Sequence, residues 1–323
     1  MRVPTVAVVA GLIVSGFTMT MGARAEWPER PITFVVPYAA GGGNDNSARI
    51  TAQWVARALK QNVIVENRTG ANGAIAAEFV ARAPADGYTN FMTASPTMVI
   101  VPHMQKINYD PFKSFAPISI IDAGSIAFAV NPTFPAKTFS ELVAYAKPRP
   151  NKLDYATGAT GSTGHLSMAL LLKRATITMT HVPYKGSSAA VVAVLGGHVP
   201  VYVGTLSDGL EHHKSGKLRI IGVSSSKRSG ELPDVPTIAE QGYPGYTTAF
   251  WNALLAPAGT SKDVIATLAE TLRAACRDAG FNTKYQALNV EALCTTPEQF
   301  SEKLQADSAI WKEAVKASGM ALE

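Results

Sequence analysis

The chain has 323 residues, of which 47% are apolar and 16% are charged, and its formal net charge is +5. This core-rich composition excludes an intrinsically disordered protein, and the mild, scattered positive charge excludes a nucleic-acid-binding surface. The length favours one large or two medium domains.

The first 25 residues have the three parts of a secretory signal peptide. Arg2 supplies the positive start, residues 6–17 are apolar, and residues 23–25 (A-R-A) form a small-residue cleavage site. The apolar stretch is too short to span a bilayer, and no cysteine stands directly after the signal to carry a lipid anchor. We therefore expect cleavage before Glu26 and an exported protein without membrane insertion, which is periplasmic in a two-membrane bacterium. The signal removes two of the 29 basic residues, which leaves 27 against 24 acidic ones, a net charge of +3.

Strand-like and helix-like segments alternate along the rest of the chain. β-rich apolar runs predict strands at 32–36, 62–67, 88–93, 126–130, 152–157, 181–184, 199–203 and 218–223. Apolar residues at helical spacing predict helices at 46–59, 73–83, 140–146 with Ser140 as N-cap, 165–173, 188–195, 261–279 and 297–318. After Ser261 the chain is expected to be helical to its end. Repeated strand–helix units predict an α/β fold with mainly parallel sheets covered by helices.

Two of these units share a glycine-rich turn between the strand and the helix. The first has G-G-G-N-D at 41–45, and the second has T-G-A-T-G-S-T-G-H at 157–165, about 120 residues later. A helix N-terminus carries unpaired N–H groups and a partial positive charge, so such a turn suits an anion. Two lobes that each present one helix N-terminus to a shared cleft explain this spacing better than one sheet. In an exported protein this pattern indicates capture of a small acidic solute.

Other readings of the second loop fit less well. Its spacing is GxxGxxG, and the acidic residue that a dinucleotide fingerprint needs about 20 positions on is absent. The sequence has no P-loop and no G-x-S-x-G nucleophile elbow. Ser162 and His165 could form the nucleophile and base of an exported hydrolase or lyase. Without an evident orienting acid, a helix-capping hydroxyl that faces a ligand is the better interpretation.

For each of three further features, the sequence leaves two interpretations open. Asp45 is either a ligand contact or a first-turn carboxylate that stabilises its helix, and we favour the structural role. Lys185 either pairs with a solute carboxylate or lies on the rim. Cys276 and Cys294 either form a disulfide, which an oxidising compartment allows, or stay as buried thiols. The histidines, including the pair at 212 and 213, lack metal-ligand spacing, so we expect no metal and no cofactor.

In order and spacing, a series of short motifs resembles the extracytoplasmic solute receptors of tripartite tricarboxylate transporters, the Bug-type (Bordetella uptake gene) receptors. The resemblance covers essentially the whole mature chain. The matching segments lie at 27–32, 36–38, 41–45, 65–68, 70–73, 83–89, 158–166, 181–186, 195–197, 216–219, 232–237 and 256–260. One departure is visible at Ala39 and Ala40, where many relatives have prolines, so this loop is expected to be less rigid.

The resemblance implies a two-lobed periplasmic binding protein (Venus-flytrap) fold with two crossing strands between the lobes. Lobe 1 would contain residues 26–124 and 248–323, and lobe 2 residues 125–247. The implied function is capture of a small carboxylate in the cleft and delivery to the subunits of a membrane transporter, without catalysis. A solute sensor for a membrane signalling partner is an alternative role. The identity of the solute stays open, and we expect a monomer.

The expected ligand-binding residues lie in the glycine loops and at the strand ends of both lobes. They are Tyr38, Ala39, Ala40, Gly42, Gly43, Asn44, Asp45, Ser95, Thr160, Gly161, Ser162, Thr163, His165, Lys185, Gly186, Thr205 and Asp208.

Overall fold

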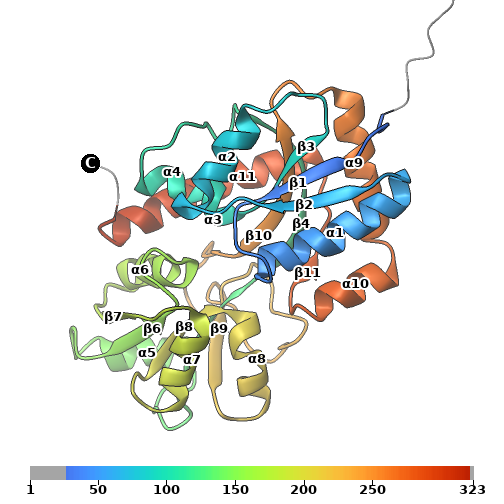
Figure 1. The fold of residues 1–323 in the computed structure, drawn as a ribbon. Helices are drawn as coiled ribbons and strands as arrows, with labels where there is room; N and C mark the ends of the chain where they lie inside the picture. Colours follow the sequence, from blue (N-terminus) through green and yellow to red (C-terminus); the bar gives the residue numbers. More distant parts are fainter. Residues whose placement is uncertain (1–26, 321–323) are drawn as a thin grey trace, which may run out of the picture.

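The computed structural model describes residues 27–320. The predicted signal peptide and its cleavage site therefore lie outside the described residues. The chain forms two lobes, each built on one mixed sheet with helices on both faces (Figure 1). This confirms the predicted two-lobed α/β fold.

The first lobe has a six-stranded sheet in the order β11-β4-β10-β3-β1-β2. Its strands are β1 (Ile32–Val36), β2 (Val63–Asn67), β3 (Thr89–Ala94), β4 (Phe115–Gly124), β10 (Phe250–Pro257) and β11 (Glu291–Ala292). Its helices are α1 (Gly43–Leu59), η1 (Ala71–Gly73), α2 (Ala74–Ala81), α3 (Ser95–Val99), α4 (Val101–Met104), α9 (Lys262–Ala275), α10 (Ala279–Gln286) and α11 (Pro297–Ala317).

The second lobe has a five-stranded sheet in the order β7-β6-β8-β5-β9. Its strands are β5 (Ile126–Val130), β6 (Asp154–Thr157), β7 (Thr180–Pro183), β8 (Val201–Thr205) and β9 (Arg219–Val223). Its helices are α5 (Phe139–Ala146), α6 (Thr163–Ala175), α7 (Ser187–Leu195) and α8 (Leu206–Lys214).

The chain passes between the lobes at one place in each direction. Ser125 alone separates β4 from β5, and the return runs from the end of β9 to the start of β10. Ser224 joins the two passages, because its backbone N–H donates to the carbonyl of Ile126 and its own carbonyl accepts from Thr248. Two adjacent connections of this kind form a natural hinge.

Each sheet has one face that buries an apolar layer of its own lobe. The apolar layers on the other faces of the two sheets join into one. Val55 of α1 and Leu268 of α9 pack on one face of the first sheet, whereas Trp251 and Trp311 pack on the other. That second layer continues into the second lobe, where Leu166 of α6 belongs to it. The lobes are therefore in contact along α6 and α11.

Three predictions about local structure were wrong. Helix α5 begins two residues after Lys137, with Thr138 rather than Ser140 as the N-cap, because the Thr138 side chain accepts from the N–H of Glu141. The chain is not helical from Ser261 to its end, since it breaks between α9 and α10 and forms the short strand β11 before α11. The sheets are not mainly parallel, because β10 pairs antiparallel with β3 and β4, and β5 pairs antiparallel with β8 and β9.

Cys276, the C-cap of α9, is disulfide-bonded to Cys294, with their Cα atoms 6.0 Å apart. This decides between the two interpretations left open by the sequence. The bond closes a loop that contains α10 and β11, and so ties both elements to the end of α9.

Candidate functional site

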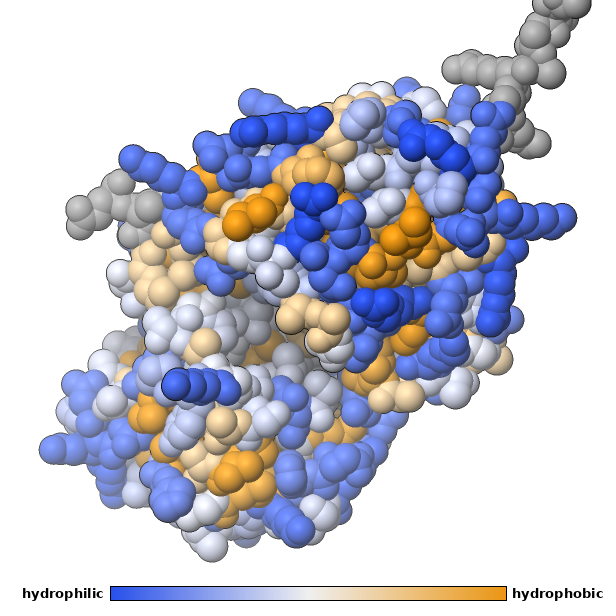
Figure 2. Space-filling view, in the orientation of Figure 1, coloured by the Kyte–Doolittle hydropathy of each residue, from blue (hydrophilic) through white to orange (hydrophobic). Residues whose placement is uncertain are grey.

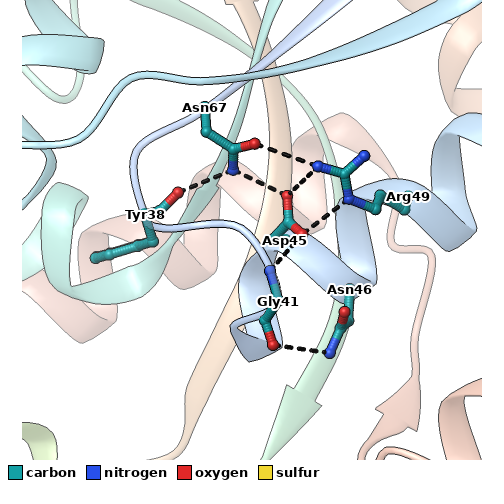
Figure 3. A network of polar contacts seen from close by, with 6 residues as sticks. All are labelled: Tyr38, Gly41, Asp45, Asn46, Arg49 and Asn67. Carbon is teal, nitrogen blue, oxygen red and sulfur yellow. Dashed lines mark hydrogen bonds and ion pairs between the residues drawn. The ribbon is translucent and has the colours of Figure 1, made fainter.

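The first glycine loop is held by a carboxylate that points back into it. Gly41 has a positive φ of 83°, and its backbone N–H donates to Oδ2 of Asp45 at 2.8 Å. Arg49, one turn further along α1, donates to both oxygens of Asp45. Asn67, at the end of β2, donates to Asp45 Oδ1 and to the carbonyl of Tyr38 (Figure 3). The loop is thereby tied to two neighbouring strands.

Asp45 is 1% exposed, and its hydrogen bonds explain how it stays ionised. Burial alone would raise its pKa, but the bonds from Arg49, Gly41 and Asn67 together hold the pKa below its ordinary value. Each of its oxygens is used inside the protein. The structural role that the sequence favoured for Asp45 is therefore the one that its contacts support.

The start of α1 has no side-chain cap. Its N-cap is Gly42, and the N–H groups of Gly43, Asn44 and Asp45 have no acceptor among residues 27–320. Ala39 to Gly43 are exposed. Exposed glycine backbone and unpaired N–H groups thus lie together at the positive end of a 17-residue helix.

The second glycine loop repeats this arrangement at the start of α6, with a difference. Ser162 is the N-cap, and its Oγ accepts from the backbone N–H of His165 at 3.3 Å. The N–H groups of Thr163 and Gly164 have no acceptor among the described residues. Thr160 is exposed, and Gly161 to Thr163 are partly exposed.

Ser162 and His165 are not arranged as a nucleophile and its base. Nδ1 of His165 accepts a hydrogen bond from the backbone N–H of Gly161 at 3.0 Å. No bond between the His165 ring and the Ser162 hydroxyl exists among the described contacts. The hydroxyl instead caps α6, which is the helix-capping interpretation of these residues.

Two more helices of the second lobe begin at strand ends. Gly186 is the N-cap of α7, and Thr205 is that of α8; neither has a side-chain cap bond. Lys185 is exposed and has no ion-pair partner among the described residues. Asp208 accepts hydrogen bonds from the hydroxyls of Thr205 and Tyr202.

The side chains of three expected residues point into the first lobe. Ser95 is fully buried, and its hydroxyl accepts from the backbone N–H of Trp251. The hydroxyl of Tyr38 bonds to that of Thr97, 2.9 Å away, and burial raises the Tyr38 pKa. Asn44 is 8% exposed and donates its amide to Asn252. Contact between these residues and a ligand stays a prediction.

Sequence reasoning missed a buried polar network behind α1. Asp122 on β4 accepts from Ser47 of α1 and from Asn252 of β10. Tyr285 of α10 completes it with a bond to Ser47, 3.1 Å between the hydroxyl oxygens. Burial raises the pKa of Asp122 to about 7, although both hydrogen bonds lower it. Four elements far apart in the sequence are joined here. They meet at Ser47, two residues after the end of the first glycine loop.

A hollow lies between the two lobes in the space-filling view (Figure 2). Helix α1 begins on the side of the first lobe that faces the second lobe (Figure 1).

A family model for the tripartite tricarboxylate transporter family receptor matches residues 47–320. The chain belongs to this receptor family.

Three known proteins are similar to this one along nearly the whole chain. Protein BugT of Bordetella pertussis is 33% identical over 96% of this chain and 98% of its own. The structure of R. palustris Rpa4515 with adipate is 33% identical, with a TM-score of 0.77 over 92% of this chain and 99% of its own. MatC from Rhodopseudomonas palustris with bound malate is 29% identical, with a TM-score of 0.73 over 90% of this chain and all of its own. The predicted Bug-type resemblance and the fold are confirmed.

A second hollow of the receptor, of about 830 Å³, lies beside the hinge. Its walls come from both lobes, with Ser225–Glu231 on one side and Asn282 to Leu293 on the other. It contains none of the expected ligand-binding residues. Its side chains Arg228 and Glu231 are already paired with Glu240 and Lys214, so we place the candidate site at the glycine loops.

Two features are absent from the described part of the chain. Within residues 27–320, no three His, Cys, Asp or Glu side chains gather closely enough to hold a metal ion. No helix in the same range is both long and apolar enough to cross a membrane.

Proposed function

We propose that this receptor is periplasmic, captures a small carboxylate in the cleft between its lobes and delivers it to the membrane subunits of a tripartite tricarboxylate-type transporter. The observation that carries the proposal is the open start of α1. Exposed glycines, no side-chain cap and free N–H groups make it a site for an oxyanion. The relatives solved with adipate and with malate support a carboxylate ligand.

The two glycine loops would supply different hydrogen-bond donors to the carboxylate. The first loop supplies backbone donors in a frame that Asp45 fixes from behind. The second supplies backbone donors together with the hydroxyls of Ser162 and Thr163. We propose that these loops, 41–45 and 160–165, face each other across the cleft, with lobe 1 formed by 26–124 and 248–323 and lobe 2 by 125–247.

Binding through backbone groups explains how one fold would serve different carboxylates. A carboxylate held by N–H donors does not need a buried cationic side chain. The rest of the pocket is then free to differ between receptors. Lys185 and Gly186 at the start of α7, and Thr205 and Asp208 at the start of α8, would contact the remainder of the solute. Closure of the lobes would bury the ligand and couple affinity to the hinge.

A thermal-shift screen of mono-, di- and aromatic carboxylates, acidic amino acids and neutral analogues tests the proposal. We expect the melting temperature to rise with one carboxylate class and not with its amides. Calorimetry then measures the affinity, and chromatography of the incubated ligand checks for turnover. Stabilisation by neutral analogues alone would contradict carboxylate capture, and conversion of the ligand would favour an exported hydrolase or lyase.

A further inference from the structure

Two histidine rings from different elements of the second lobe are stacked face to face. His165 lies on the first turn of α6 and His181 on β7, with ring centroids 3.9 Å apart and ring planes at 10°. Tyr155 of β6 adds a third ring, with its centroid 5.1 Å from that of His181. The stack places His181 directly against a residue of the second glycine loop.

Hydrogen bonds hold both rings and determine which nitrogen of His165 carries the proton. Gly161 donates to Nδ1 of His165, so the proton of a neutral His165 is on Nε2. Nε2 of His181 lies 2.7 Å from the Thr157 hydroxyl, which is also 3.1 Å from the carbonyl of Ala159, so this ring is held to β6 by a hydrogen bond. The backbone donor therefore fixes the tautomer of a neutral His165 as Nε2–H.

Among residues 27–320, no charged group raises the pKa of either ring. Burial lowers the pKa of His165, and burial together with the adjacent ring lowers the pKa of His181 to about 4. Tyr155 faces the pair from β6 and is neutral, because burial raises its pKa. Asp154 alternates onto the other face of β6, and β5 and β8 contain no charged residue. On α11, Glu313 is paired with two basic residues in the last turn of α6.

In this stack, the Nε2–H group of His165 is a hydrogen-bond donor that the protein itself does not use. It has no hydrogen-bond partner among the described residues, and it is not one of their fully buried unpaired polar atoms. Water or a ligand therefore reaches it. It lies on the same helix turn as the free backbone N–H groups of Thr163 and Gly164.

We propose that His181 is a positioning residue, which holds His165 as an uncharged Nε2–H donor at the second glycine loop. The stacked ring keeps water off one face of His165, and two imidazolium rings at this distance would repel each other. A carboxylate would meet a donor of fixed direction whose charge does not change with pH near neutrality. This inference rests on the proposed function for its ligand, whereas the state of His165 is a property of the protein alone.

A histidine-ring NMR titration of the ligand-free protein tests the inference directly. We expect His165 to be the neutral Nε2–H tautomer at neutral pH and to titrate below the ordinary value of about 6.5. In His181→Ala the midpoint of His165 should rise towards that value, and in His181→Phe, which keeps a stacked ring, it should return. His198→Ala removes an exposed histidine outside the stack and should leave His165 unchanged.

The inference is overturned if wild-type His165 carries its proton on Nδ1, or if His181→Ala leaves its midpoint where it was. With a carboxylate from the screen, we expect the Nε2–H signal of His165 to shift on binding and His181→Ala to weaken affinity about threefold to tenfold. Binding without either effect overturns the donor role. If no carboxylate binds, the proposed function fails, and the ligand-free titration still decides the role of His181.

Discussion

Asn252 donates its side-chain amide to Asp122 at 2.8 Å, across the antiparallel pair β10 and β4. Both strands lead to the crossing between the lobes, where β4 ends at Gly124 and β10 begins at Phe250. The same carboxyl accepts from Ser47 of α1. One buried acid thus joins the hinge strands to the helix that begins at the first glycine loop.

This acid predicts a pH dependence of stability. The pKa of Asp122 is raised by burial from 3.8 to about 7, so the folded protein binds this proton more tightly than the unfolded chain does. The resulting stabilisation is complete below 3.8 and is lost as the pH rises to about 7. Relative to Asp122→Asn, the wild-type unfolding free energy should fall by up to about 1.4 kcal/mol per pH unit in that window. Urea denaturation of both proteins measures this. A difference that does not vary with pH would refute it.

Substitutions of two glycines in the first loop should affect stability and ligand affinity differently. Gly41 has a positive φ, so Gly41→Ala should lower the unfolding free energy by about 1 kcal/mol. A Cβ atom on Gly43 would meet nothing within 4 Å, so Gly43→Ala and Gly43→Val should keep the fold. Gly43→Val should nevertheless abolish ligand binding by blocking approach to the backbone. Calorimetry beside thermal denaturation checks this, and unchanged affinity in Gly43→Val would make the loop purely structural.

Asp45 and Arg49 should differ strongly in their effect on stability, although they form one ion pair. Asp45 is buried with three different donors, so Asp45→Asn should cost about 1–3 kcal/mol at neutral pH. The side chain of Arg49 is 48% exposed, so Arg49→Ala should cost less than about 1 kcal/mol.

Acid should reduce the difference between Asp45→Asn and the wild type. The pKa of Asp45 is lowered in the folded protein, against the effect of its burial, by bonds from Arg49, Gly41 and Asn67. Its contribution is therefore present above the ordinary pKa and is lost as the pH falls below it. Chemical denaturation at neutral and acid pH compares the two proteins, and equal losses for Asp45→Asn and Arg49→Ala would be inconsistent with this network.

The hydroxyls of the second loop should have separable roles. Ser162 caps α6, so Ser162→Ala should cost about 1 kcal/mol of stability as well as affinity. Thr163→Ala should weaken ligand binding by a few-fold to about tenfold and leave stability nearly unchanged. Thr138→Ala, which removes the cap of α5, is the matched control with lost stability and normal binding. Normal affinity in both loop variants would exclude these hydroxyls from the site.

The sequence predicted the elements that have a clear period, and missed those whose residues give mixed signals. Strand β4 contains Pro117, which argues against a central strand, and the structure accommodates it beside a register irregularity opposite Leu255. Strand β10 is a short apolar run that fits a buried strand or helix equally well. These two strands supply the antiparallel pairings of the first sheet. In the second sheet they come from β5, which was predicted as a strand but not in this direction.

The glycine loops could be found from the sequence because strand, turn and helix are contiguous there. The contact between Asp45 and Arg49 is also of a kind that sequence can predict, since residues four apart share a helix face. The contacts of Asp45 with Asn67 and of His165 with His181 join separate strands and helices, so only the fold reveals them. Asp122 and Asn252 are 130 residues apart, and no local pattern connects them.

The central claim is most directly tested by a crystal structure of the protein with a carboxylate from the screen. The account predicts the carboxylate group at the N-terminus of α1, bonded to backbone N–H groups of residues 43–45. It also predicts that the loop at 160–165 closes over the ligand from the other lobe. A carboxylate bound in the hollow beside the hinge, or held by side chains away from both glycine loops, would contradict it.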